Sequence, residues 1–138
     1  MSYTSRSYIK TYTPSDDVLI NDSPSVAVSE AVYTLKKQIK LQQPVGALST
    51  YRFVFGIKQS FAGANQIYGK IYRNGIPIGS EFMTDGTNLE NTCTQDIVTS
   101  NFIVGDSIEL WCHIGGGAAG QCMHLQICGT GSEWGVII

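Results

Sequence analysis

The chain has 138 residues, of which 43% are hydrophobic and 14% are charged, and its formal net charge is −2. Such a length is enough for one domain with its own core and is short for two ordinary domains. The net charge provides no general attraction to nucleic acid or to anionic membranes, so neither is expected as a partner. No segment approaches about 18 consecutive apolar residues, the length of a membrane-spanning helix, so no membrane insertion is expected.

The charged fraction is low compared with about 25% in average soluble proteins. A surface with few charges is easier to bury against copies of itself, because fewer charges must be desolvated or paired. We therefore expect a homo-oligomer. The alternative is a monomer with a neutral, polar surface.

Residues 1–30 contain Pro14, Pro24 and only short apolar runs such as Val18-Leu19-Ile20. This composition predicts an extended N-terminal arm with one or two short strands. The segment MSYTSRSYIKTYTPSDD has no apolar run of signal-peptide length, which indicates synthesis in the cytosol. Residues 31–138 are expected to form the globular domain.

The first clear alternation begins at Ala31 and places Tyr33, Leu35, Ile39 and Leu41 on one face of a strand, interrupted by Lys37. Lys36, Lys37 and Lys40 form the only basic cluster of the chain. Lysines on a strand discourage edge pairing and keep it soluble, and this role is favoured over phosphate binding. The next segment, TYRFVFGIK, alternates strictly, with one face formed by Tyr51, Phe53, Phe55 and Ile57. This pattern is typical of a half-buried antiparallel strand.

The segment YRNGIPIG predicts a tight hairpin, because Asn74 and Gly75 both tolerate the positive φ that a two-residue type I′ turn requires. The turn sets the register of the two strands, in which Ile67, Ile71, Ile78 and Phe82 share one apolar face. The expected facing pairs are Arg73 with Ile76, Tyr72 with Pro77, Ile71 with Ile78, Gly69 with Ser80, and Ile67 with Phe82. Pro77 lacks an N–H group and predicts an open or irregular outer edge at that position.

Later strands include one with Cys93, Gln95 and Ile97, and one formed by VGDSIELWCHI, which follows a Gly-Asp turn. The second places Ile108, Leu110, Cys112 and Ile114 on one face and Glu109, Trp111 and His113 on the other. In the strand CMHLQIC, Met123, Leu125 and Ile127 are expected together. A simple hairpin across GGGAAG that paired Cys112 with Cys122 would mix apolar and polar faces. This register favours a connection that crosses from one sheet to another.

Short strands with closely spaced turns, and no helical period of ten or more residues, predict an all-β, single-domain antiparallel β-sandwich of the jelly-roll type. No catalytic motif is present: the chain lacks a Gly-x-Ser-x-Gly elbow and a His-Glu-x-x-His helix. We expect no enzyme and no cofactor.

The four cysteines, Cys93, Cys112, Cys122 and Cys128, contain no Cys-x-x-Cys pair, and the only histidines are His113 and His124. Structural zinc sites usually draw ligands from closely spaced pairs, so no metal site is expected. Buried free thiols, or one or two disulfides, remain the alternatives for the cysteines.

From Gly46 onward, GALSTYRFVF, IYGKIYRNGIPIG, VGDSIELW and MHLQICG follow in an order that resembles the globular heads of the complement-component and tumour-necrosis-factor-like jelly rolls. The resemblance covers about two thirds of the chain. Minimal jelly rolls of this kind are also similar to virus turret, spike and head-decoration subunits, often trimers or higher rings. The resemblance therefore implies a self-associating structural protein of a virion surface or capsid, made in the host cytoplasm, with other structural proteins as partners.

Two other functions remain open: a carbohydrate- or receptor-binding module located in the cytoplasm or at a cell surface, and a strand-exchanging subunit of an extracellular filament. The residues expected to carry an interface or a binding site are aromatic residues on outward strand faces and the apolar chain end. They are Tyr68, Tyr72, Trp111, His113, Trp134, Val136, Ile137 and Ile138.

Overall fold

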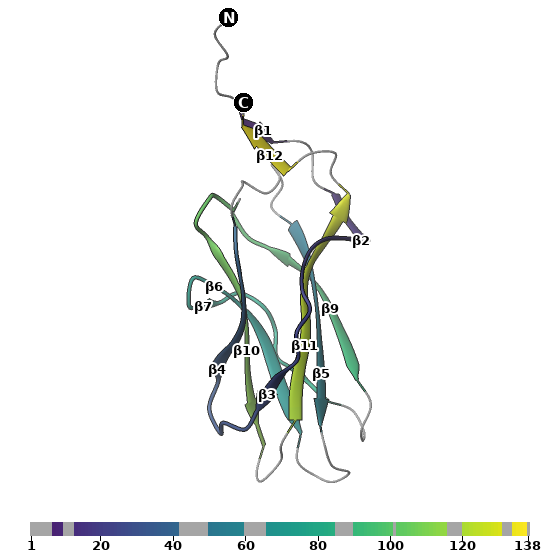
Figure 1. Ribbon diagram of the computed structural model, residues 1–138, viewed down its shortest axis with the longest axis vertical. Coiled ribbons are helices and arrows are strands. Elements are labelled where there is room, and N and C mark those ends of the chain that lie inside the picture. Colours follow the sequence, from purple (N-terminus) through teal and green to yellow (C-terminus); the bar gives the residue numbers. More distant parts are fainter. Residues whose placement is uncertain are drawn as a thin grey trace, which may run out of the picture.

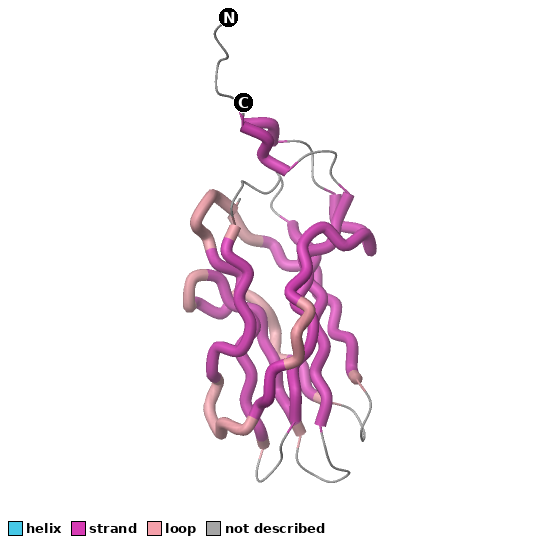
Figure 2. The backbone as a smooth tube through the Cα atoms, in the orientation of Figure 1, coloured by secondary structure: helices cyan, strands magenta, loops and turns pink. Residues whose placement is uncertain are grey.

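The computed structural model describes residues 7–9, 13–41, 50–59, 66–84, 90–100, 102–115, 120–130 and 134–137. These residues form strands and loops, with no helix among them, and the strands build two antiparallel sheets that pack face to face (Figures 1 and 2). The predicted all-β, single-domain sandwich is confirmed.

Each sheet takes strands from distant parts of the chain. The first, called the β11 sheet, has the order β2-β11-β5-β9 with β3 also on β11; its strands are β2 (Thr13–Asp22), β3 (Val26–Val28), β5 (Thr50–Gln59), β9 (Asn91–Val98) and β11 (Gly120–Thr130). The second, called the β10 sheet, has the order β4-β10-β6-β7 with β8 also on β6; its strands are β4 (Thr34–Lys40), β6 (Ile67–Arg73), β7 (Ile76–Pro77), β8 (Phe82–Met83) and β10 (Ser107–Ile114).

The strand pairs are nested in the sequence, which is the signature of a jelly roll. β3 pairs with β11, β4 with β10, β5 with β9, and β6 with β8. The first strand of the roll thus pairs with the last, the second with the second last, and so on inward along the sequence. Successive pairs alternate between the two sheets. The connection from β10 to β11 therefore crosses between sheets, as the incompatible hairpin register predicted.

The first thirty residues, expected to form an extended arm with one or two short strands, supply three strands within their described part. β2 and β3 both pair with β11, and β1 (Ser7–Ile9) pairs with β12 (Trp134–Ile137) in a separate ribbon at one end of the molecule (Figure 1).

The core lies between the two sheets and is built from the alternating positions of β5, β6 and β10. The inward side chains are fully buried at Tyr51, Phe53, Phe55, Ile57, Ile67, Ile71, Ile108, Leu110 and Cys112. These inward faces are confirmed. Ile78, Phe82 and Ile114 pack partly buried against the same core.

The Asn74-Gly75 turn is confirmed, with φ of 51° and 80° at these residues. Arg73 faces Ile76 and Tyr72 faces Pro77 as predicted, and β7 lies at the outer end of the β10 sheet order. Beyond Pro77 the predicted register is wrong by two residues, because Gly69 faces Phe82 and Tyr68 faces Met83. The N–H groups of Ile78 and Gly79 both donate to the Ile71 carbonyl, at 3.0 and 3.1 Å, so a bulge absorbs the extra residues.

The expected inward face of β4 is also partly wrong. Leu35 is 40% exposed, whereas Lys37 is only 3% exposed. A register irregularity lies where Leu110 faces Lys37 and the next residue, Trp111, faces Leu35. The bulge reverses the phase of the strand before Lys37, so Leu35 turns outward, while Lys37 stays on the buried side with Ile39 and Leu41, as simple alternation places it.

A second irregularity, in β11, alters the expected grouping of Met123, Leu125 and Ile127. The pairing passes from Met123↔Gly56 directly to Leu125↔Phe55. Leu125 and Ile127 are fully buried, but Cys122 takes the inward position instead of Met123, which is half-buried.

No helix within the described segments is long and apolar enough to cross a membrane.

Candidate functional site

Four of the predicted site residues meet on the outer face of the β10 sheet. Tyr68 and Tyr72 come from β6, and Trp111 and His113 come from β10, which pairs with β6. Tyr68 and His113 face each other directly and stack, with ring centroids 4.6 Å apart and an interplanar angle of 9°. Tyr72 and Trp111 are diagonal neighbours and stack at 4.6 Å and 13°. We call these residues, together with Tyr33, the aromatic face.

Tyr33 joins the two stacked pairs from the segment before β4. Its ring meets His113 edge-on at 4.4 Å and lies 6.2 Å from the ring of Tyr72. The Lys70 Nζ atom lies 5.0 Å from the centroid of the Tyr33 ring, within the range of a cation–π contact. The face is therefore a continuous layer of rings with a cation beside it.

Two carboxylates hold the polar tips of this layer. The Trp111 Nε1–H donates to Glu109 Oε1 at 2.9 Å, and the Tyr33 hydroxyl donates to Glu81 Oε2 at 2.5 Å. Glu81 Oε2 also lies 3.7 Å from His113 Nε2. Burial and the hydrogen bond to Glu81 raise the pKa of the Tyr33 hydroxyl, so it remains a donor at neutral pH.

The rings of the aromatic face are partly exposed, so a ligand can lie against them. Tyr33, Tyr68, Trp111 and His113 are half-buried, while Tyr72 is buried beneath its neighbours. Rings fixed by stacking and hydrogen bonds lose little conformational freedom when a ligand covers them. The arrangement offers ring surfaces, carboxylate acceptors and one ammonium group.

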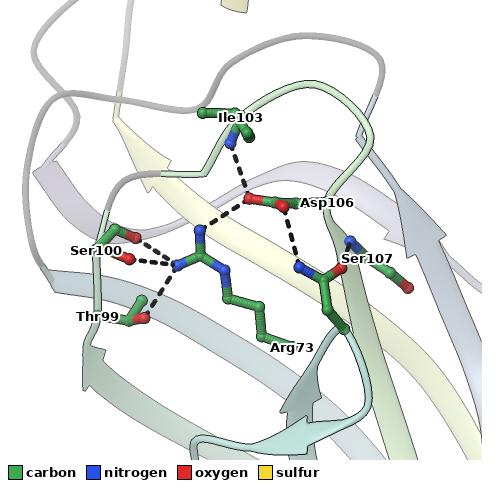
Figure 3. A network of polar contacts seen from close by, with 7 residues as sticks. Arg73, Thr99, Ser100, Ile103, Asp106 and Ser107 are labelled. Carbon is green, nitrogen blue, oxygen red and sulfur yellow. Dashed lines mark hydrogen bonds and ion pairs between the residues drawn. The ribbon is translucent and has the colours of Figure 1, made fainter.

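A second candidate surface surrounds the predicted hairpin turn. Arg73 bridges the hairpin to two other segments: its guanidinium donates to Thr99 Oγ1, to the Ser100 carbonyl and hydroxyl, and to Asp106 Oδ2 (Figure 3). The side chain of Asn74 donates to Asp106 Oδ1 at 3.0 Å and accepts from the Ser107 N–H at 2.8 Å. Asp106 also accepts from the Ile103 N–H at 2.9 Å. This network holds the turn against the loop before β10.

Aliphatic side chains project from the segments that the network holds together. Ile76 is 65% exposed, Ile103 64% and Val104 53%. Ile76 follows the turn, and Ile103 and Val104 lie in the loop that Asp106 stabilises. We call these three residues the apolar rim. Single exposed aliphatics are ordinary, but these three project from segments that one hydrogen-bond network holds in place, so they are exposed on an ordered part of the surface.

Three of the chain-end candidates lie on a different element from the two surfaces. Trp134, Val136 and Ile137 belong to β12, where they face Ile9, Tyr8 and Ser7 of β1. Ile138 lies outside the described residues.

All four cysteines are buried as free thiols. Within the described segments, no group of three or more His, Cys, Asp or Glu side chains could hold a metal ion.

Sequence reasoning missed several members of these surfaces. The hairpin register already placed Tyr68, Lys70 and Tyr72 on one face, so the position of Lys70 was available from alternation. Tyr33 was assigned to the inward face of β4, and Glu81 lies 48 residues away from it, so their contact had no local signal. The apolar rim residues Ile103 and Val104 have no sequence signal beyond being two apolar residues directly before the Gly-Asp turn.

No protein-family model and no curated protein matches the sequence. Among solved structures, the chain is similar to the EclA C-terminal domain, described as a sugar-binding protein. The TM-score is 0.40 and the sequence identity 8%, over 90% of this chain and 80% of that chain. A likeness of this extent carries no argument about function.

Proposed function

We propose that the protein is a self-associating jelly-roll subunit of a larger assembly, of the virion surface or capsid type. The observation that carries the proposal is the apolar rim, in which Ile76, Ile103 and Val104 are each more than half exposed on segments fixed by Arg73 and Asp106. Full burial of one such aliphatic side chain contributes about 1.5–3 kcal/mol. Because the segments are already ordered, little of this is lost to ordering on association.

Composition supports a second copy of the chain as the occupant of the rim. Only 14% of the residues are charged, so two copies can approach without desolvating many charges. Trimers or higher rings are the expected states, since jelly rolls that resemble this chain commonly form them. The same proposal places the protein in a virion, with other structural proteins as its partners. The proposed function includes no catalytic step.

Light scattering on the purified protein at several concentrations tests self-association. The wild-type chain is expected to have a mass of three or more copies, and the double variant Ile103→Ser, Val104→Ser is expected to be a monomer. Val32→Ser is the matched control, because Val32 is also exposed but lies near the opposite end of β10, where Glu30 accepts from the Ile114 N–H. A monomeric wild-type chain, or an oligomer that the double variant leaves intact, would contradict the proposal.

The aromatic face supports a second candidate function, carbohydrate binding. Sugar rings stack on aromatic side chains through their C–H faces, and their hydroxyl groups donate to carboxylates such as Glu81. Tyr68, Trp111 and His113 provide partly exposed rings for such a contact. This function needs no self-association.

Binding to immobilised neutral and acidic oligosaccharides separates the two candidates. If the aromatic face binds glycans, Trp111→Ala should abolish binding without changing the native mass, and Trp111→Phe should retain part of it. A wild-type chain that binds no oligosaccharide would reject the carbohydrate function. If Trp111→Ala instead dissociates an oligomer, the aromatic face is a subunit contact.

A further inference from the structure

Cys112 and Cys122 come from opposite sheets and meet in the core. Cys112 lies toward the end of β10 and Cys122 near the start of β11, and both side chains are fully buried. Each thiol has the largest single effect on the pKa of the other, so the two groups are neighbours in the core. Both are free thiols in this structure.

Glycines lie beside the two cysteines where the facing sheets pack against each other. Gly69 is the cross-strand partner of Cys112, and Ile57 is the partner of Cys122. A Cβ atom on Gly69 would lie 3.4 Å from Ile57 Cγ2, so these two partners pack directly across the sandwich. Nearby, a Cβ atom on Gly120 would lie 2.6 Å from Ile67 Cγ1 of the facing sheet. Glycine at both positions therefore permits the close approach that a bridge between sheets requires.

Electrostatics distinguishes the two sulfurs. The interaction with the Cys112 thiol lowers the pKa of Cys122, against the opposing effect of burial, and the ammonium groups of Lys37 and Lys36 lower it further. The pKa of Cys112 is raised by the same interaction and by burial. Both lysines are held by partners: Lys36 Nζ lies 2.6 Å from Glu30 Oε1, and Lys37 Nζ 3.3 Å from Asp22 Oδ1. Cys122 is thus the more nucleophilic thiol of the pair.

We propose that Cys112 and Cys122 are an oxidisable dithiol that closes into a disulfide between the two sheets, with a low-molecular-weight disulfide as the oxidant. This inference is independent of the self-association proposed above. It differs from the hairpin bridge rejected by register, because the two strands belong to different sheets and need no cross-strand pairing.

The reaction is two successive thiol–disulfide exchanges. The Cys122 thiolate attacks one sulfur of the small disulfide, a mixed disulfide forms, and one small thiolate leaves. The Cys112 sulfur, after losing its proton, then attacks the Cys122 sulfur and releases the second thiolate. The two protein thiols are oxidised to one disulfide, the small disulfide is reduced to two thiols, and the two protons end on those thiols.

Peptide mapping after refolding in a mixture of reduced and oxidised glutathione tests the bridge. Refolding gives the oxidant access before the core closes. Chymotryptic cleavage after Trp111 and Met123 releases a peptide, 112–123, that contains both cysteines. The expected peptide is lighter by about 2 Da and takes up no iodoacetamide until it is reduced. Cys93 and Cys128 are the internal controls and should be alkylated without reduction once the chain is unfolded.

Thermal unfolding provides the second measurement. The bridged chain should unfold at a higher temperature than the reduced chain, by an amount on the order of 10 °C, and this difference should vanish in Cys112→Ser and Cys122→Ser. The peptide map uses the wild-type chain, so it stands even if a serine variant fails to fold. The proposal is overturned if peptide 112–123 remains fully alkylated after oxidative refolding, or if Cys112 is linked to Cys93 instead.

Discussion

Arg73 and Asp106 form a partly buried ion pair that joins the hairpin after β6 to the loop before β10. The Arg73 Nη2 atom lies 2.8 Å from Asp106 Oδ2, and the side chains are 14% and 11% exposed. Arg73 also lies 4.2 Å from the centroid of the Phe102 ring. The pair connects the turn that the sequence specifies most strongly to a loop about thirty residues later in the chain (Figure 3).

We expect Asp106→Asn to lower the free energy of unfolding by about 2 kcal/mol, because it leaves the Arg73 guanidinium without its charged partner in a partly buried site. Urea denaturation followed by circular dichroism measures the change. Asp96→Asn is the control: Asp96 also pairs with an arginine, Arg52, at 2.8 Å, but its side chain is 42% exposed. Its loss should stay within about 1 kcal/mol. Equal losses in the two variants would contradict the structural role given to Asp106.

The same carboxylate predicts how stability depends on pH. Burial acts to raise the pKa of Asp106, but the Ile103 N–H, the Asn74 amide and the Arg73 guanidinium outweigh it, so this pKa lies below its usual value. A group with a depressed folded-state pKa stabilises the fold above its unfolded pKa of about 3.9, and this contribution disappears as pH falls through the folded pKa.

Melting temperatures between pH 2 and pH 7 should therefore fall below about pH 4. The pKa of Asp96 is also lowered, by its hydrogen bond to Arg52, so part of the fall should remain in Asp106→Asn. A variant profile as steep as that of the wild-type chain would show that Asp106 does not contribute.

Lys37 is a buried cation whose stem and charge can be tested separately. Its ammonium group donates to the Pro24 carbonyl and pairs with Asp22, and its side chain is 1% exposed. Lys37→Met keeps the stem and should cost about 1 kcal/mol, since the half-buried Asp22 can be hydrated. Lys37→Ala also leaves a cavity and should cost about 2–3 kcal/mol. Chemical denaturation of both variants measures the difference, and equal costs would show that the charge, not the packing, matters.

Gly120 is a point of close approach between β11 and its surroundings. A Cβ atom there would lie 2.3 Å from the Lys58 carbonyl oxygen and 2.6 Å from Ile67 Cγ1. We expect Gly120→Ala to lower the melting temperature by roughly 10 °C, because backbone must shift to admit the methyl group. The adjacent, exposed Gln121→Ala should change it little. If Gly120→Ala melts like the wild-type chain, the two sheets are not in close contact at this point.

Much of the architecture could be predicted from local patterns in the sequence. Strict alternation in β5 and β10 identified the buried faces, because side chains of a strand point alternately to its two sides. Asn74 and Gly75 specified the turn and its first two pairs, because few other residues adopt positive φ. Incompatible faces across GGGAAG placed β10 and β11 in different sheets.

The candidate surfaces could be predicted only in part. Alternation along each strand is sufficient to place Tyr68, Tyr72, Trp111 and His113 on outer strand faces. That they stack on one another, and that Tyr33 and Glu81 complete the layer, depends on which strands pair, and a single strand carries no information about its neighbours.

The sequence by itself thus determined the fold class, the inward faces of the regular strands and the tight turn, because these follow from residue conformation and a period of two. The tertiary structure alone decided the bulges in β4 and β11, the shifted pairing of β6 with β8, and the contact of Cys112 with Cys122. Each of these features depends on packing between segments that are distant in the chain. A bulge or a glycine there lets the two segments fit together, and the local sequence pattern of either segment does not show this.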